Sequence, residues 1–408
     1  MMKGAFDLII FTDHFPYGNS ESFLSDELQF LSEAFKNILI VPIDTSGGSP
    51  KRYVPKNITI HPPPFKNLKS KSLLIYKGLF NLSPVFPFFK EGISHKVWKS
   101  GVIFRNWATS IFLMRSLAAY FRSLLHRQSI GQEALLYFYW GLRWSQVIPF
   151  LPARFNRIFI RMHGSDLYEE LNNNYIPFRH EQIKRAKGVF LISRMAIKYF
   201  LSKYPFMADK TYFSPLGSHD QGLNPNQHKI SGFHIVSCSN MVPVKRIHLL
   251  AESLNFIKNQ IVWTHFGTGS ERELIQDIIN KAGNNFRAEL KGWVSHAELM
   301  HYYATTHIDL FLNTSSSEGV PVSVMEALSF GIPVIATDVG GTSEILDSSC
   351  GKLIPVNISA KLLADEIDSF LSKPDLENYR INARYSWEKT SNCSKFYPEF
   401  VELLTTFI

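Results

Sequence analysis

The chain has 408 residues, of which 45% are hydrophobic and 19% charged. This composition excludes a disordered protein, and the length exceeds one usual core, so we expect two domains. Three widely separated cysteines, in no metal-ligand spacing, exclude a disulfide framework and indicate a reducing compartment. No apolar stretch is long enough to span a bilayer, and the run from Leu8 to Phe11 is too short for a signal-peptide core.

The net charge of +8 is unevenly distributed. Residues 51–130 hold 14 Lys or Arg and one acid, Glu91, whereas the rest of the chain holds 29 basic and 34 acidic residues. The same segment contains Trp98, Trp107 and many Phe and Leu residues. Basic and aromatic residues interleaved on amphipathic helices favour an anionic membrane surface. No nucleic-acid-binding motif accompanies the charge, so we expect no nucleic acid. The alternative is a basic face that is simply solvated.

Short apolar runs alternate with helical stretches from one end of the chain to the other. Such runs separated by helices indicate parallel sheets covered on both faces, so the expected fold class is α/β with two doubly wound domains facing a cleft. The expected strands of the first half are 6–11, 38–42, 135–139, 157–162 and 188–192, and those of the second half are 234–238, 261–266, 287–291, 309–312, 333–336 and 352–355.

The polar, Gly- and Asn-rich segment 216–232 is the expected linker. It would separate a first domain, residues 1–215, from a second domain, residues 233–388. Residues 389–408 would form a C-terminal helix. Ligands of doubly wound domains bind at the carboxyl ends of the strands.

The stretch from Glu318 to Glu326 places two carboxylates eight positions apart around a Gly-Val-Pro turn. A short apolar helix, Val322 to Phe330, should follow and end at Gly331. A helix N-terminus can hold an anion such as phosphate. Ionised carboxylates only accept hydrogen bonds, so their expected targets are hydroxyls. A ligand with phosphate between two sets of hydroxyls is a nucleotide-sugar.

Four other strand-to-helix junctions carry candidate residues, and junctions of this kind bind ligands in doubly wound sheets. Each also has a plain structural alternative: a surface lysine, a satisfied core histidine or a simple turn. The residues are Lys245 and Arg246 in segment 237–246, Gly267 and Gly269 in 266–273, Val294 in 290–295, and His163 in 161–168.

Together these residues resemble the family-4 glycosyltransferases of group 1 type, retaining enzymes with the two-domain GT-B fold. The resemblance covers nearly the whole chain and is strongest from Ile235 to Leu346. It includes the segment from Gly331 to Leu346 and a glycine-containing first loop, Phe15 to Phe23. The resemblance implies an N-terminal acceptor-binding domain, a C-terminal domain that binds the nucleotide-sugar, and a last helix that returns to the N-terminal domain.

The resemblance also implies roles. The expected catalytic residues are Glu318 on the transferred sugar, Lys245 on the departing diphosphate and His163 near the reacting carbon. Donor-binding positions would be Glu326 on the ribose hydroxyls, the backbone of Val320, Pro321 and Val322 on the distal phosphate, Gly18 and Gly267 at the phosphates, Val294 at the base, and Asn240 and Arg246. Glu21 would face the acceptor, or would instead cap a helix.

One position departs from the family pattern. Asn240 stands where many members carry an arginine, five residues before Lys245. Arg246 or an arginine of the first domain would then have to replace that cation. No Asp-x-Asp sequence is present, so we expect no metal and no cofactor.

The expected function is that of a hexosyltransferase, which transfers the sugar of a UDP- or GDP-linked donor to a saccharide or lipid-linked saccharide. The setting would be surface polysaccharide or glycolipid assembly (capsule, O-antigen or exopolysaccharide), with the protein cytoplasmic and peripheral at the inner face of the cell membrane. The alternatives are a nucleotide-sugar epimerase and a non-catalytic protein that binds a nucleotide-sugar or glycan.

Overall fold

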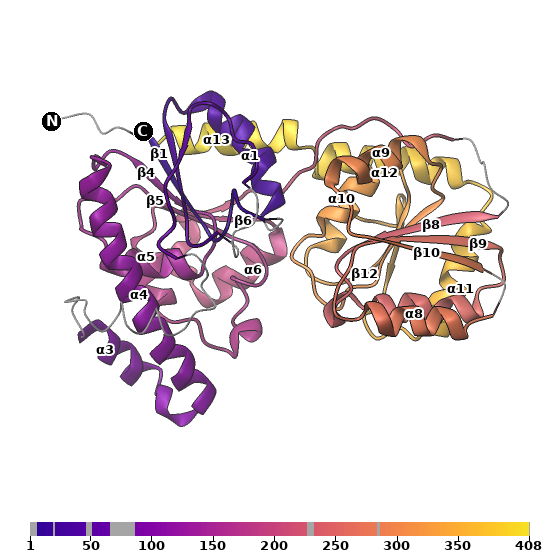
Figure 1. The fold of residues 1–408 in the computed structure, drawn as a ribbon, viewed down its shortest axis with the longest axis horizontal. Coiled ribbons are helices and arrows are strands. Elements are labelled where there is room, and N and C mark those ends of the chain that lie inside the picture. Colours follow the sequence, from indigo (N-terminus) through magenta and orange to yellow (C-terminus); the bar gives the residue numbers. More distant parts are fainter. Residues whose placement is uncertain are drawn as a thin grey trace. The chain divides into compact units, whose positions relative to one another are not determined.

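The computed structural model describes residues 6–18, 21–45, 51–65, 86–226, 232–283 and 286–407. It consists of two compact units, each with a central parallel sheet and helices (Figure 1). The first unit comprises Met1–Ser214 with Tyr397–Ile408, and the second comprises Pro215–Phe396. The predicted fold class, α/β with two doubly wound domains, is confirmed.

The sheet of the first unit has seven strands in the order β3-β2-β1-β4-β5-β6-β7. All neighbours pair in parallel, and the strand order reverses between β1 and β4. The strands are β1 (Leu8–Thr12), β2 (Ile38–Pro42), β3 (Ile58–Ile60), β4 (Leu135–Phe138), β5 (Ile158–Met162), β6 (Gly188–Leu191) and β7 (Thr211–Phe213).

Strand side chains alternate between two apolar clusters, one on each face of this sheet. Ile9 and Phe11 belong to one cluster, and Leu8 and Ile10 belong to the other. This period of two is why continuous apolar runs can be buried on both faces. The helices of the unit are α1 (Ser22–Ala34), α3 (Phe86–Ser94), α4 (Gly101–Arg127), α5 (Arg179–Arg185) and α6 (Arg194–Lys203), with 3-10 turns η1 (Val97–Lys99), η2 (Arg143–Phe150), η3 (Glu169–Asn172) and η4 (Pro205–Lys210).

The sheet of the second unit has six parallel strands in the order β10-β9-β8-β11-β12-β13, and its order reverses between β8 and β11. The strands are β8 (Phe233–Cys238), β9 (Ile261–Phe266), β10 (Phe286–Gly292), β11 (Leu310–Asn313), β12 (Val334–Thr337) and β13 (Gly351–Ile354). The helices are α7 (Ile247–Ser253), α8 (Arg272–Lys281), α9 (His296–Thr305), α10 (Val322–Ser329), α11 (Ala360–Leu371), α12 (Leu376–Thr390) and α13 (Cys393–Thr405), with 3-10 turns η5 (Pro243–Lys245), η6 (Leu254–Phe256) and η7 (Thr342–Glu344).

Helix α13 belongs to both units, because its residues from Tyr397 onward pack within the first one. It lies beside α1 in Figure 1, and the Tyr397 ring contacts Phe30 of α1 at 5.6 Å between centroids. Phe400 contacts Tyr137 of β4 and Phe190 of β6. The end of the chain therefore completes the core of the first unit.

A buried ion pair joins several elements of the first unit. Arg161 of β5 bonds through Nη1 to Glu27 of α1, and both side chains are fully buried. Tyr137 donates to the other oxygen of Glu27 at 2.8 Å. Arg161 Nη2 donates to the carbonyl and hydroxyl of Ser214 at 2.8 and 2.7 Å, and the guanidinium lies over the Phe400 ring. One cation thus links α1, β4, β5, the residue after β7 and α13.

Every strand predicted from the sequence is present, with ends within two residues of those expected. Two strands were missed, β3 and β7. Each has only three residues and lies at an edge of the first sheet, where side chains are partly exposed. A three-residue edge strand forms by pairing with its neighbour and carries too little periodicity to be predicted locally.

Candidate functional site

The candidate residues of the second unit gather at the carboxyl edge of its sheet. All strands are parallel, so their carboxyl ends share one edge. The strand order reverses between β8 and β11, and ligands of doubly wound sheets bind at such a reversal. Lys245 lies in η5 after β8, and Glu318 lies in the loop after β11. These two residues therefore lie on either side of the reversal.

Glu318 is held by three donors through a single oxygen. Its Oε1 lies 2.6 Å from Lys245 Nζ and accepts from Ser315 Oγ at 2.6 Å and Asn313 Nδ2 at 3.4 Å. Its Oε2 has no hydrogen-bond partner in the part of the chain that the structure describes. The protein therefore fixes one carboxylate oxygen, and the other keeps its capacity to accept hydrogen bonds.

Backbone contacts hold this loop in place. Ser316 N donates to Val244 O at 2.8 Å, which joins the loop after β11 to the loop after β8. Gly340, in the loop after β12, has φ +55°, and a Cβ there would lie 2.0 Å from the carbonyl oxygen of Glu318. Only glycine allows this backbone conformation without strain and this approach without a clash, so Gly340 positions Glu318.

Glu326 lies within α10, about one turn from its start, as the sequence predicted. Its Oε1 lies 2.8 Å from Nε2 of His296, the first residue of α9. The helix ends at Ser329, and Gly331 follows with φ +70°. Val320 is buried, and Pro321 occupies the N-cap position without a side-chain cap, so the first amides of α10, beginning at Val322, have no capping side chain.

Backbone carbonyls hold the side chain of Arg246 at this edge of the sheet. It adopts a left-handed conformation at φ 49° and donates through Nε to Thr314 O at 2.7 Å and through Nη1 to Val356 O. Asn240 is exposed in the loop after β8. The guanidinium expected to replace the missing cation thus braces the loops after β11 and β13.

The glycines after β9 have a clear packing role. Gly267 has φ +138°, and a Cβ on it would lie 1.9 Å from Ser239 O. A Cβ on Gly269 would lie 2.3 Å from Met241 O. Both allow the loop after β9 to pack against the loop after β8. Val294 is half-buried, two residues before His296.

In the first unit, His163 follows β5 and is buried among aromatic rings. Its ring centroid lies 4.3 Å from that of Trp140 and 5.1 Å from that of Tyr139. Neither ring nitrogen has a hydrogen-bond partner among the residues that the structure describes. Nδ1 lies 3.9 Å from Oδ2 of Asp166. Burial tends to raise the pKa of Asp166, but His163 and the amides of Gly141 and His163 outweigh burial and lower it.

Glu21 is fully engaged within its own unit. Its carboxylate accepts from the amides of Asp13, His14 and Phe15 at 3.0, 2.8 and 2.6 Å, and from Trp140 Nε1 at 2.6 Å. The expectation that Glu21 faces the acceptor is not supported by these contacts, and its side chain does not cap α1 either. It instead shapes the loop after β1.

Other residues of this loop complete the cluster. Gly18 has φ +67°, and its carbonyl accepts from Arg52 Nε at 2.7 Å. Burial raises the pKa of Asp13 to about 7, although Arg143, at 2.5 Å from Oδ2, opposes the shift. Sequence reasoning missed Asp13, Trp140, Asp166, His296 and Ser315; position at the end of a strand was the available signal for most of them.

Two parallel sheets covered by helices, each with candidate residues at its carboxyl edge, define a two-domain protein of Rossmann-like α/β fold. Solved structures share this fold over the whole chain. Sucrose-phosphate synthase from Thermosynechococcus elongatus is 15% identical with a TM-score of 0.72, covering 98% of both chains. Anabaena HepE in complex with UDP is 15% identical with a TM-score of 0.68, covering 98% of this chain and 100% of that one. The chain therefore has the GT-B fold.

Sequence comparison then finds relatives for part of the chain. Residues 223–387 match the family described as glycosyl transferases group 1. A probable sucrose-phosphate synthase from Thermosipho melanesiensis is 30% identical over 218 residues, which cover 50% of each protein. The GtfA subunit of a UDP-N-acetylglucosamine–peptide N-acetylglucosaminyltransferase from Streptococcus agalactiae is 30% identical over 193 residues, 45% of this chain and 37% of the relative.

The chain thus spans half or less of the length of the first curated relatives that it matches. A third relative, a putative colanic acid biosynthesis glycosyltransferase WcaL of Escherichia coli, is 26% identical over 224 residues, 51% of this chain and 53% of the relative. The match over residues 223–387 confirms the resemblance to group 1 glycosyltransferases for this part of the chain.

Proposed function

We propose that the chain is a retaining family-4 glycosyltransferase that moves a hexosyl group from a nucleoside diphosphate sugar to a saccharide or lipid-linked saccharide. The observation that carries the proposal is the pairing of Lys245 with Glu318 across the reversal of the second sheet. A cation for a diphosphate and a carboxylate for sugar hydroxyls lie side by side there. Glu326 supplies a second carboxylate for the ribose.

Lys245 has the chemistry to serve both partners at once. An ammonium group has three N–H donors, and in this structure one is used by Glu318. The remaining donors are available to a diphosphate. As the donor bond breaks, negative charge grows on the departing phosphate, and a positioned cation stabilises that charge.

Retention requires that the acceptor attacks the face from which the diphosphate leaves. A retaining glycosidase would place two carboxylates about 5 Å apart around the reacting bond. In the proposed mechanism the departing phosphate instead helps deprotonate the acceptor. His163, buried and with both ring nitrogens free of hydrogen bonds, is proposed to lie against the donor sugar. The protein then contributes positioning and charge stabilisation.

Uridine diphosphate is the donor group that we propose. Solved relatives in this fold are described in complex with UDP and UDP-glucose, and another with UDP and N-acetylglucosamine. We expect UDP to raise the melting temperature by a few degrees at saturation, because ligand at 100 times Kd stabilises by about 2.7 kcal/mol. GDP, ADP and dTDP should raise the melting temperature less than UDP does. Absence of any shift, together with no release of UDP from UDP-sugars, would contradict the proposal.

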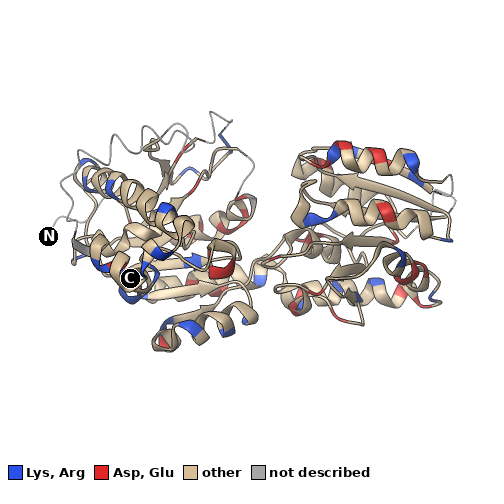
Figure 2. Cartoon of the chain, turned by 90° about the horizontal axis from the view of Figure 1, so that it is seen from below, with Lys and Arg blue, Asp and Glu red and all other residues tan. Residues whose placement is uncertain are grey.

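The proposed acceptor lies at an anionic membrane surface. Helix α3, η1 and the start of α4 expose large apolar side chains, each 46–64% exposed, between basic ones. Such a patch on a monomer marks an interaction site, and its charge suits anionic lipid. Figure 2 shows Lys and Arg in blue along the helices of the first unit. We call this the α3–α4 surface: Phe89, Ile93, Trp98, Val102 and Phe104, with Lys90, Lys96, Lys99 and Arg105.

None of the helices that the structure describes combines the length and the apolar character that a membrane span requires.

Vesicle sedimentation tests this surface. The protein should sediment with phosphatidylglycerol vesicles at low salt and be released as salt screens the charges. Changing both Trp98 and Phe104 to serine should weaken binding by at least about 100-fold, because burying each large apolar side chain contributes about 1.5–3 kcal/mol. The matched control changes Ile381 and Tyr385 of α12, exposed to 59% and 64%, and should bind as the unaltered protein does. Equal loss in both variants would contradict the assignment.

A further inference from the structure

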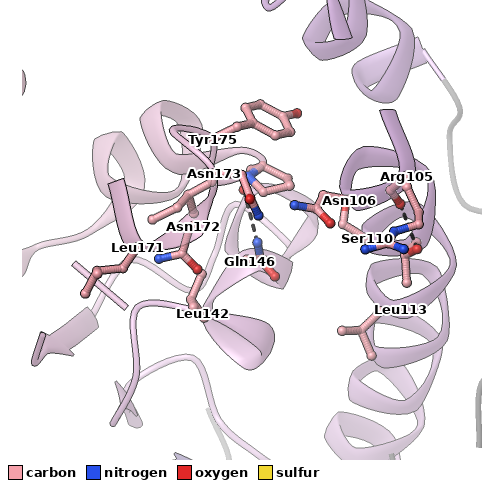
Figure 3. A pocket seen from close by; sticks show the side chains of 13 residues that line it. Arg105, Asn106, Ser110, Leu113, Leu142, Gln146, Leu171, Asn172, Asn173 and Tyr175 are labelled. Carbon is pink, nitrogen blue, oxygen red and sulfur yellow. Dashed lines mark hydrogen bonds between the residues drawn. The ribbon is translucent and has the colours of Figure 1, made fainter. Parts of the chain in front are cut away.

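A cavity of about 390 Å³ lies in the first unit, away from the aromatic cluster around His163. One wall is the N-terminal half of α4, and the other is formed by residues that follow β4 and β5. Figure 3 shows these walls facing each other, with Asn106 pointing from α4 towards Gln146 and Asn173. Pockets of roughly 300–1,000 Å³ hold small ligands, so this cavity can take a sugar unit.

The lining is mixed: apolar side chains such as Leu113, Leu142 and Leu171 lie beside polar ones, and it contains no Asp or Glu. Besides the Tyr175 hydroxyl, which donates to Glu91 at 3.2 Å, four side-chain amides, two hydroxyls and one guanidinium face or border the cavity. An amide both donates and accepts hydrogen bonds, as a sugar hydroxyl does, so amides suit a polyol. The residues are Asn106, Gln146, Asn172, Asn173, Thr109, Ser110 and Arg105.

Some of these groups are anchored and others are free. Gln146 accepts from the Arg143 amide at 3.1 Å and donates to Pro177 O at 3.3 Å, and Asn172 donates to Ser165 O at 2.7 Å. These bonds fix the far wall.

By contrast, the side chains of Arg105, Asn106 and Asn173 form no hydrogen bond with any residue that the structure describes. Two amides and one cation are therefore available to a ligand. The cation comes without a neighbouring carboxylate in the lining, so it favours a ligand that carries negative charge.

We propose that this pocket binds an anionic sugar unit of the acceptor, with the hydroxyls on Asn106 and Asn173 and the phosphate or carboxylate on Arg105. The inference rests on the proposed function, whose acceptor class it narrows. Phe104, next to Arg105, is 48% exposed on the α3–α4 surface. A lipid joined to the sugar by a phosphate would therefore have an apolar surface beside the pocket, whereas a uronic acid of a glycan would reach Arg105 from solvent.

The test measures binding to the full-length protein by ligand-observed NMR. The probes are glucose 1-phosphate, glucuronic acid, glucose and inorganic phosphate, with UDP as a separate probe of the second unit. We expect the two anionic sugars to bind more tightly than glucose or phosphate alone. Arg105→Gln should weaken the binding of both anionic sugars at least about tenfold, since a hydrogen bond to a charged group contributes about 1.5–3 kcal/mol. Asn106→Ala should weaken the binding of the same two sugars several-fold. Arg127→Gln, on the exposed far end of α4, should change nothing.

The outcomes separate the two proposals. Preference for glucose 1-phosphate over glucuronic acid would point to a lipid-linked sugar phosphate, and the reverse would point to a uronic acid. Binding of phosphate as tight as that of either sugar, with no effect of Asn106→Ala, would overturn the pocket, because it would show only an anion on a surface arginine. No binding of any sugar alongside normal UDP binding would also overturn the pocket and leave the donor site intact. If the sugars bound as expected but UDP did not bind, the result would count against the proposed function.

Discussion

Replacing Glu318 with glutamine is expected to lower kcat for sugar transfer by about 100- to 1,000-fold, the cost of removing one group that acts on the transition state. The reason lies in the two oxygens of this side chain. Oε1 is fixed by Lys245, Ser315 and Asn313, and Oε2 is free for a hydroxyl of the transferred sugar. The measurement is the initial rate of UDP release from the UDP-sugar that the protein accepts.

The same variant should bind UDP at least as tightly as the unaltered protein. Lys245 is paired with Glu318 at 2.6 Å, so removing the negative charge leaves the cation for the diphosphate. A fall in kcat without weaker UDP binding separates a role in the reaction from a folding defect. The control is Asp365→Asn, an exposed acid of α11, which should change neither value. Unchanged kcat in Glu318→Gln would show that the catalytic assignment is wrong.

Replacing Arg161 with methionine is expected to destabilise the first unit by about 3–5 kcal/mol, because it leaves Glu27 as an uncompensated buried charge. Both side chains are fully buried, and Arg161 also bonds to Ser214 and contacts Phe400. Urea unfolding at pH 8, followed by circular dichroism, measures the change. Arg127→Met, on the exposed end of α4, should stay within about 0.5 kcal/mol of the unaltered protein.

A second change tests the cause. Adding Glu27→Gln to Arg161→Met should recover much of the loss, since a neutral pair no longer buries a charge. Burial already raises the pKa of Glu27, with Arg161 opposing the shift. Without Arg161 that pKa rises further, so the single variant should lose stability as pH rises from about 4.5, the ordinary pKa of glutamate, up to the new value. If the single and double variants were equally unstable at every pH, packing rather than charge would explain the loss.

Both sheets were predictable because their strands are long, apolar and separated by helices. The strands of four or more residues are specified by local sequence, whereas the three-residue edge strands β3 and β7 are not. The helix after Pro321 was also predictable, because Gly331 provides a local stop at φ +70°. Periodicity and glycine positions are local properties, so they can be read without knowing the fold.

The roles of individual polar groups were less predictable. From the sequence, Arg246 and His163 were expected at strand-to-helix junctions, and Glu21 was expected to face the acceptor or to cap a helix. In the structure the Glu21 carboxylate accepts from three amides and Trp140, and Arg246 donates to two carbonyls. The ring nitrogens of His163 have no hydrogen-bond partner among the described residues. Their partners lie up to 119 residues away, and no local pattern encodes such pairings.

The sequence by itself therefore determined that this protein has two doubly wound domains, a group 1 glycosyltransferase motif and two carboxylates around the start of α10. Only the tertiary structure decided which oxygen of Glu318 is left free, which cation binds backbone, and that α4 and the loop after β5 enclose an amide-lined pocket. The physical reason is distance along the chain. Secondary structure depends on neighbours within a few residues, whereas a site depends on contacts made only when separate strands and helices come together.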